Sequence, residues 1–248
     1  MNKLTSIIFS VLLSLNVFGN DLFLYESTSG ITISEVVANK LKDYDITVGK
    51  TYTLTNSLSV TTSTNGTSVY VLPYRVAVYQ KENSATYFNQ TQTEYVNNFV
   101  LPEVVKVKDH LFNFSSNGEL YVISEADKPL TIGTSMGLIV FDKAKLFIKS
   151  GEKFTQVYVV EGKATVLDTK SSKKKKEIKQ GDFLVITPQA ALSPREAKVT
   201  VLGNSFSIKE VEDVEKESHT SEIKTLQSKL DNTLFVNYGS NIFGFKLK

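Results

Sequence analysis

Six lysines within ten residues form the strongest local charge signal in the sequence. They are Lys170, Lys173, Lys174, Lys175, Lys176 and Lys179, in the stretch KSSKKKKEIK. A patch of this charge makes a strong positive field, which suits contact with an anionic polymer or a phospholipid surface. The alternative, which we favour, is a solvated hairpin tip whose charge prevents edge-to-edge association of strands. No aromatic residue interleaves with these lysines, so stacking on nucleic-acid bases is not expected.

Side chains suited to catalysis or metal binding are few. The chain has no cysteine and two histidines, so thiol nucleophiles are absent and a histidine-rich metal centre is not expected. His110 precedes LFNF, and no residues that could act with it in acid–base catalysis stand near it in the sequence. We therefore interpret it as an edge-strand or loop residue. His219 lies in a charged segment. Carboxylate pairs could be drawn from four acidic residues, as in any β-protein of this size: Asp142, Glu152, Glu161 and Asp182.

The recognised catalytic motifs are also missing from the sequence. No G-x-S-x-G elbow, H-E-x-x-H helix or phosphate-binding glycine loop appears. Glu161 and Asp182 stand beside glycines, where carboxylates commonly accept hydrogen bonds from turn backbone N–H groups. The sequence therefore predicts a non-enzymatic protein with no catalytic residues, no cofactor and no metal.

The first twenty residues indicate export. A positive MNK start leads into an apolar run from Ile7 to Phe18, and small or neutral residues follow at Gly19 and Asn20. This order is typical of a secretory signal peptide over residues 1–20. The alternative, an uncleaved anchor, is disfavoured because spanning a bilayer needs about 20 apolar residues. We expect a periplasmic or otherwise exported mature chain without a transmembrane helix, stabilised by packing since it has no disulfides.

Composition points to a globular β-protein. The chain has 248 residues, of which 41% are hydrophobic and 22% charged, enough for a sizeable core. Its formal net charge of +2 is too small to predict nucleic-acid binding. Plentiful valine, threonine, tyrosine and phenylalanine suit the pleated surface of strands.

Most of the mature chain reads as short strands between turn signals. From 46 to 208 no amphipathic helix of 10–15 residues interrupts them, so we predict an antiparallel sandwich or a barrel-like or solenoid arrangement. Hairpin turns are predicted at Asn65-Gly66 and Asn117-Gly118, and a further turn at Gly203-Asn204. The N-terminal segment 21–45 is ambiguous, because ITISEVVANKLKDY suits either a helix capped by Ser34 or a strand.

The C-terminal region differs in composition from the β region before it. Residues 209–232 are charged and lack aromatics, which indicates a linker or an exposed helix with Ile223, Leu226 and Leu230 at spacings of three and four. Residues 233–248 read as a hairpin turning at Gly239-Ser240, whose aromatic side chains are expected to pack on the sheet or on a partner.

Two short stretches resemble each other. DITVGKTYTLT (45–55) and EIKQGDFLVIT (177–187) share an acidic residue, an isoleucine and a glycine before a strand that ends in threonine. The shared glycine suggests a tight turn with positive φ or close backbone approach. The β region would then consist of two related halves, 46–125 and 126–208.

The order VYVVEGKATV…IKQGDFLVITP resembles the FecR domain, which is typically exported and β-rich. The resemblance covers about Ile46 to Pro188. The sequence departs from the family pattern at FDKAKLFI, where that family often has a short glycine-containing segment. FecR itself is a transmembrane signal transducer, and this chain lacks the helix that precedes the domain there. The resemblance therefore implies a freestanding scaffold or binding module for another envelope protein or a wall or surface component.

The stretch VEG…QGDFLVITP is also similar to part of a cupin barrel. Metal-dependent cupins need histidines and a glutamate grouped on neighbouring strands. No histidine directly follows the ITP turn and none lies between Lys143 and Lys163, so that class is not expected. The alternative function is thus a metal-free cupin-like barrel that binds or acts on a small sugar or acid.

Overall fold

The computed structural model describes most of the chain from Asp21 onward. The predicted signal peptide, His110, Lys170 and Lys173 lie outside the described residues. The described ranges are 21–54, 57–88, 95–96, 99–100, 113–168, 174–192, 199–238 and 241–246.

A 17-stranded sheet folds over into two facing layers, which we call layer A and layer B. In pairing order, layer A contains β4 (Thr51–Thr53), β1 (Asp21–Ser27), β6 (Ser68–Leu72), β7 (Val76–Gln80), β11 (Asn113–Ser124), β14 (Ala144–Gly151), β15 (Phe154–Glu161), β18 (Phe183–Leu192) and β19 (Val199–Lys209). Layer B contains β3 (Lys40–Tyr44), β2 (Ile31–Val37), β5 (Leu58–Thr62), β8 (Ala85–Phe88), β11 again, β12 (Leu130–Gly133), β13 (Gly137–Phe141), β16 (Lys163–Asp168) and β17 (Lys175–Lys179).

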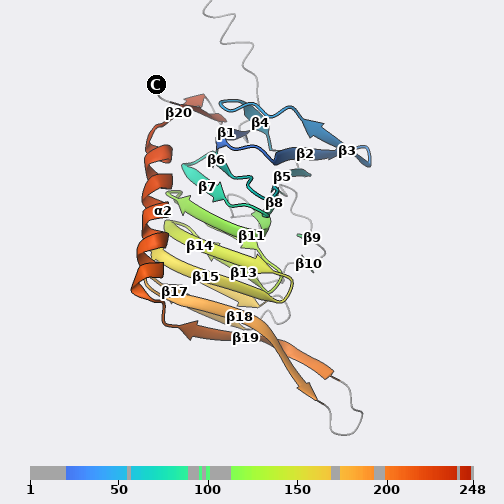
Figure 1. The fold of residues 1–248 in the computed structure, drawn as a ribbon, viewed down its shortest axis with the longest axis vertical. Helices are drawn as coiled ribbons and strands as arrows, with labels where there is room; N and C mark the ends of the chain where they lie inside the picture. The colour runs from blue at the N-terminus through green and yellow to red at the C-terminus, as the bar shows by residue number, and fades with distance from the viewer. Residues whose placement is uncertain are drawn as a thin grey trace, which may run out of the picture.

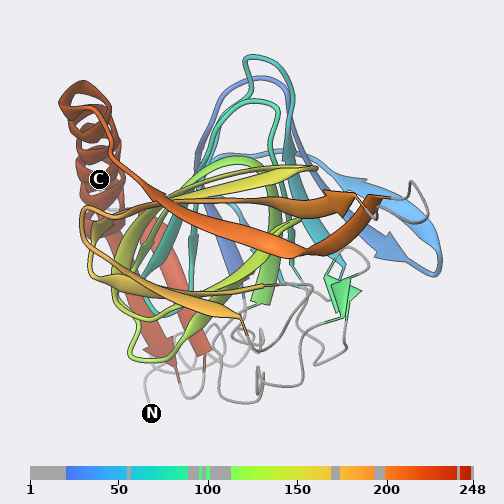
Figure 2. The same ribbon diagram turned by 90° about the horizontal axis from the view of Figure 1, so that it is seen from below.

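The strands stack along the long axis of the molecule, with helix α2 (Asp213–Asp231) running beside the stack (Figure 1). Viewed along that axis, α2 lies outside the sheet (Figure 2). Pairings between the described strands are antiparallel except that of β11 with β12, so the sheet is mixed. Strands β3, β4, β17 and β19 each have one described partner, so the sheet is not closed into a barrel. The predicted mainly β, sandwich-type class with a C-terminal charged helix is confirmed.

The space between the layers is filled with apolar side chains. In β14, Leu146 and Ile148 point into this core while Phe147, between them, points out to a second core beneath α2. Period-two alternation explains the two faces, because successive side chains of a strand point to opposite sides. The run VYVV is apolar at successive positions, as expected of a strand covered on both faces, and it forms the central part of β15, where Val157, Tyr158 and Val159 are buried.

One strand belongs to both layers. Residues Phe114 to Asn117 of β11 pair with β8 in layer B, and from Gly118 onward the strand pairs with β14 and β7 in layer A. Gly118 has φ of +95°, a left-handed conformation that glycine adopts without steric cost. The predicted hairpin at Asn117-Gly118 is therefore wrong, since glycine kinks a continuous strand between the layers instead.

The other two turn predictions between strands also need correction. Asn65 does have a positive φ of 66°, but β5 before it lies in layer B and β6 after it in layer A, so the turn joins layers instead of forming a hairpin. Gly203-Asn204 lies inside β19, opposite a register shift in β18. In both cases the strand pairing is set by partners far apart in the sequence.

The ambiguous N-terminal segment forms a hairpin of β2 and β3, so the helix alternative is wrong. Ala38 and Asn39 at its two-residue turn have φ of 49° and 61°, as type I′ hairpin turns require. At the C-terminus, β20 (Thr233–Tyr238) pairs with β21 (Asn241–Lys246), and the predicted turn at 239–240 lies outside the described residues. A small ladder of β9 (Tyr95–Val96) and β10 (Phe99–Val100) completes the described strands.

The two similar stretches form the same turn. The Gly49 N–H donates to the Leu24 carbonyl at 2.8 Å, and the Gly181 N–H donates to the Val159 carbonyl at 2.8 Å. Both glycines have positive φ, of 82° and 87°. Each turn leads from a layer B hairpin into a layer A strand, β4 or β18. The glycine turns are confirmed, and the division into two related halves stays a prediction.

Candidate functional site

The lysine cluster lies on β17, an edge strand of layer B. β17 pairs with β16 along one side only, and Lys175, Lys176 and Lys179 are exposed. Lys175 and Lys179 lie on the outer face of the layer, whereas Lys176 is on the same face as Ile178, which is buried in the core between the layers. An inward-facing charge on an edge strand discourages further strands from pairing there. This arrangement agrees with the interpretation that the lysines limit edge-to-edge association.

Lys174 differs from these exposed lysines because its side chain contacts layer A. Its Nζ donates to the Asn204 carbonyl of β19 and lies 5.2 Å from the ring centre of Phe206. The Asn204 side chain is itself buried and donates to Asp168 Oδ1 at 2.7 Å and to the Met136 carbonyl at 2.7 Å. Lys174 thus links the end of β17 in layer B to β19 in layer A, a structural contact that sequence reasoning did not foresee.

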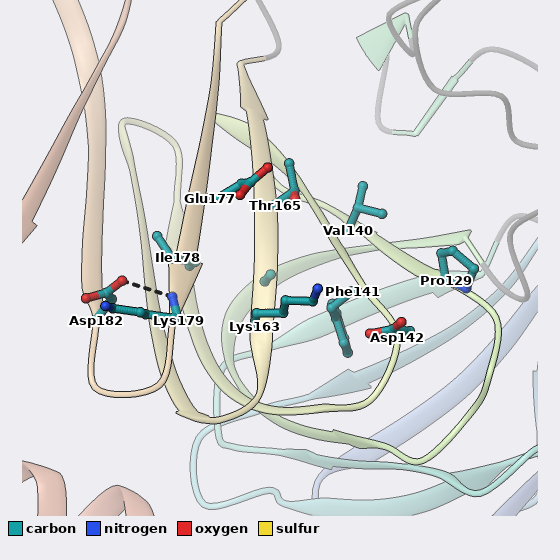
Figure 3. A pocket seen from close by; sticks show the side chains of 11 residues that line it. Pro129, Val140, Phe141, Asp142, Lys163, Thr165, Glu177, Ile178, Lys179 and Asp182 are labelled. Atoms are coloured by element: carbon teal, nitrogen blue, oxygen red, sulfur yellow. Dashed lines mark hydrogen bonds between the residues drawn. The ribbon is translucent and has the colours of Figure 1, made fainter.

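A surface hollow of 440 Å³ lies beside β17 on layer B (Figure 3). Val140 and Pro129 form its apolar side, and the Lys163 side chain extends toward it from β16 in Figure 3. Thr165 pairs with Glu177 across β16 and β17. The full lining is Pro129, Val140, Phe141, Asp142, Lys163, Ala164, Thr165, Glu177, Ile178, Lys179 and Asp182.

The lysines around this hollow differ from other strand lysines in their electrostatic environment. Lys145 and Lys149 on β14 each lie 2.6 Å from a carboxylate, of Glu161 and Glu119. Within the described chain, by contrast, no carboxylate lies within ion-pair distance of the lysines on the outer face near the hollow, Lys163, Lys175 and Lys179. Asp142, Glu177 and Asp182 also line the hollow, so it offers lysines to the anionic groups of a ligand beside carboxylates and an apolar side.

The candidate carboxylates are not brought together as a catalytic pair. Asp182 Oδ2 accepts from the Lys179 backbone N–H at 2.9 Å, as predicted for a turn carboxylate. Asp142 Oδ1 accepts from the Lys143 N–H at 2.8 Å. Glu161 forms an ion pair with Lys145 instead of binding turn backbone. The described residues contain no group of three or more histidine or acidic side chains suited to hold a metal ion.

A buried polar cluster between the layers is satisfied by its own members. The Tyr70 hydroxyl donates to Thr86 Oγ1 at 3.0 Å, and Thr86 Oγ1 donates to Gln80 Oε1 at 2.9 Å. Gln80 Nε2 in turn donates to the Val60 and Ser84 carbonyls, at 3.1 and 2.9 Å. Because these polar groups are fully buried and bonded to each other, the cluster stabilises the core and offers no group to a ligand.

Helix α2 packs on a row of aromatic side chains across the outer face of layer A. These residues are directly opposite one another on successive strands, namely Tyr79, Tyr121, Phe147, Tyr158 and Phe183. From α2, Ile223, Leu226 and Leu230 are buried against this face, which confirms their predicted helical spacing. Such cross-strand aromatic contacts each contribute about 0.5–1.5 kcal/mol beyond burial of area.

His219 is buried where the helix meets this aromatic row. Its ring lies 4.2 Å from that of Phe147, nearly parallel at 26°, and its Nδ1 is 3.0 Å from the Tyr121 hydroxyl. Sequence reasoning placed His219 only in a charged segment; its spacing of four from Ile223 was the available signal. Within the described chain, its Nε2 has no hydrogen-bond partner and lies 3.6 Å from Glu215 Oε1.

Stability is expected to fall as the pH drops below about 6.5, the ordinary pKa of histidine. Burial lowers the pKa of His219, against the opposing effect of the Glu215, Glu119 and Glu222 carboxylates. Below that pH the unfolded chain therefore binds a proton that the folded chain does not. The free energy of unfolding falls by up to about 1.4 kcal/mol per pH unit until the pKa of His219 in the folded chain is reached. Urea unfolding at several pH values measures this slope. The slope of the unfolding free energy against pH should be smaller in His219→Phe. An unchanged slope would contradict the role given to buried His219.

Comparisons with known proteins assign no family to the chain. No protein-family model matches the chain, and no curated protein matches it. Two crystal structures from Parabacteroides distasonis, each described as a "putative anti-sigma factor", are similar to it at 10% identity. The matches cover 77% of this chain and 99% of each of those chains, with TM-scores of 0.43 and 0.40. A likeness of this degree assigns no activity or partner to the chain.

The one described α-helix is not a membrane-spanning element. Helix α2 carries charged residues along much of its length and buries one side against layer A. Within the described residues, no helix combines the length and the apolarity needed to cross a bilayer.

Proposed function

We propose that this chain is an exported, non-enzymatic FecR-like β-protein that serves as a binding module for another envelope protein or a wall or surface component. Export rests on the N-terminal sequence pattern, and the family on the motifs between 46 and 188. The non-enzymatic role is supported by the separate structural contacts of the candidate carboxylates, since Asp182 and Asp142 accept from turn backbone and Glu161 pairs with Lys145.

The contact surface that we propose is the outer face of layer B beside β17. The observation that carries this choice is the set of lysines without ion-pair partners, Lys163, Lys175 and Lys179, around a hollow with an apolar side. A partner segment would complement this surface if it set acidic side chains against the lysines, a basic one against Asp142, Glu177 and Asp182, and an apolar one against the Val140 wall. The positive field would also speed association, more so at low salt.

The cupin-like alternative lacks structural support. A small-molecule site in a barrel interior needs a closed barrel with a cavity. Here the sheet has edges at both ends, and the space between the layers is filled by side chains such as Leu120, Ile132, Leu146 and Val166, all fully buried.

Charge reversal of the lysine surface should abolish partner capture. We expect Lys163→Glu, Lys175→Glu and Lys179→Glu, combined in one variant, to lower recovery of a crosslinked envelope partner at least tenfold. The reason is that three attractive charges become repulsive at the contact, and rim charges govern association. The measurement is quantitative mass spectrometry of material that co-purifies with the tagged chain after crosslinking in the source cells.

A variant with a similar charge change elsewhere provides the control. Lys153, in the turn between β14 and β15, and Lys224 of α2 are exposed, and their combined replacement by glutamate should leave partner recovery unchanged. Equal recovery with the wild-type chain and the triple variant would refute the proposed surface, and recovery no higher than background for the wild-type chain would refute the binding role.

A further inference from the structure

The hairpin of β2 and β3 ends in an exposed apolar tip, residues 35–42, which we call the finger. Val36 is 50% exposed, Val37 47% and Leu41 69%, although large aliphatic side chains in the rest of the described chain are mostly buried. The finger extends from the stack on the side away from α2 (Figure 1). Exposed aliphatic residues gathered at one protruding point indicate a contact surface.

The geometry of the finger places these side chains on both of its faces. Val36 lies directly opposite Leu41, and Val37 lies directly opposite Lys40. The tight turn at Ala38 and Asn39 projects the tip beyond the core, where Ile33 is the last fully buried residue of β2. One face of the tip is thus aliphatic, with Val36 and Leu41, and the other combines Val37 with Lys40, an arrangement suited to the boundary between an apolar phase and water.

The charges nearest the turn of the finger are positive, those of Lys40 and Lys42, and the carboxylates of Glu35 and Asp43 lie nearer its base. The Tyr44 hydroxyl donates to Glu35 Oε2 and the Ser34 hydroxyl donates to Asp43 Oδ1 at 2.7 Å, which holds both carboxylates at that base. Lys40 and Lys42 are exposed beside the aliphatic residues, with Lys42 Nζ 5.0 Å from the Tyr44 ring centre. Long lysine side chains can keep their charge at a polar boundary while their stems lie along apolar surface.

We propose that the finger docks on an anionic lipid surface. Val36, Val37 and Leu41 would enter the boundary between headgroups and acyl chains, and Lys40 and Lys42 would contact the anionic headgroups. The finger lies at the same end of the stack as β1 (Figure 1), the strand that follows the apolar N-terminal run. This orientation is independent of the partner surface on layer B, which is proposed at the opposite end of the stack.

Pairing of β3 with a second copy of the chain fits the observations less well. The outer edge of β3 has no described partner, so strand addition there is geometrically open. In an antiparallel pair of two β3 edges centred on Leu41, Lys40 of one copy would face Lys42 of the other. Like charges directly opposite destabilise such a pair, whereas both lysines favour an anionic membrane.

Vesicle sedimentation tests this proposal. The chain from Asp21 to Lys248, which keeps every described element, is mixed with phosphatidylethanolamine vesicles with or without phosphatidylglycerol. We expect sedimentation with the anionic vesicles, a loss of at least tenfold in Val36→Asp with Leu41→Asp, and about a fivefold loss for each of Lys40→Gln and Lys42→Gln. High salt should reduce binding by the wild-type chain.

The control is Val214→Asp, which changes an aliphatic residue of α2 that is 77% exposed and should leave sedimentation unchanged. Circular dichroism verifies that the finger variants remain folded, as expected for exposed positions. The proposal is overturned if the chain does not sediment, if the finger variants sediment as the wild-type chain does, or if vesicles without phosphatidylglycerol bind it equally well.

Discussion

Replacing Gly118 with alanine should destabilise the protein by about 2–5 kcal/mol. A left-handed backbone conformation costs an L-residue about 1–2 kcal/mol, and overpacking adds about 1–3 kcal/mol. At this position an added Cβ would lie 2.6 Å from Ser84 Cα, a backbone atom that cannot move aside. Urea unfolding followed by circular dichroism and tyrosine fluorescence measures the loss.

Gly49→Ala is the matched control for this substitution. Gly49 has φ of +82°, close to the +95° of Gly118, but an added Cβ would meet nothing within 4 Å. Its cost should therefore be the conformational part alone, about 1–2 kcal/mol. Equal losses in the two variants would mean that β11 does not cross tightly between the layers at Gly118.

Replacing Leu226 with aspartate should detach helix α2 from layer A. Leu226 is 1% exposed and packs on the outer face of the layer, so the change removes apolar burial and places a charge there. Removing such a side chain alone costs about 2–5 kcal/mol, and burying an unpaired charge costs more. We expect amide hydrogen exchange to rise throughout α2 and the unfolding midpoint to fall.

Polar contacts at the edges of the helix should not compensate for that loss. Lys229 forms an ion pair with Glu26 at 2.8 Å, and Lys81 with Glu222 at 2.9 Å, but both pairs are partly exposed. Exposed pairs contribute at most about 1 kcal/mol each. Val214→Asp, at an exposed position of the same helix, should leave hydrogen exchange unchanged. Protection of α2 that survives in Leu226→Asp would show that the helix does not depend on the aromatic row.

Local features of the fold could be predicted from the sequence because they depend on near neighbours. The interior strand VYVV and the turns at Gly162 and Gly181, with φ of 86° and 87°, follow from apolar runs and adjacent glycines. The helix face of Ile223, Leu226 and Leu230 follows from its spacing. In each case the sequence within a few residues determines the conformation.

The features that were missed depend on residues far apart in the chain. Asn117-Gly118 reads as a hairpin, but β11 continues through a kink there because β8 pairs with the residues before Gly118 and β14 with those from Gly118 onward. His219 is buried only because Tyr121 and Phe147 lie beneath α2. Lys174 contacts Asn204, 30 residues away. Turn residues in the sequence do not predict such pairings, because contacts between distant segments determine which strands are neighbours.

Site-specific photocrosslinking in the source cells tests the proposed binding role most directly. A benzophenone amino acid would replace Thr165, a half-buried residue lining the hollow beside β17, or Ser221, an exposed residue of α2. We predict a discrete crosslinked species of higher mass at position 165 in the exported fraction, absent at position 221. No adduct at position 165, or the same adducts at both positions, would contradict a partner-binding surface on layer B.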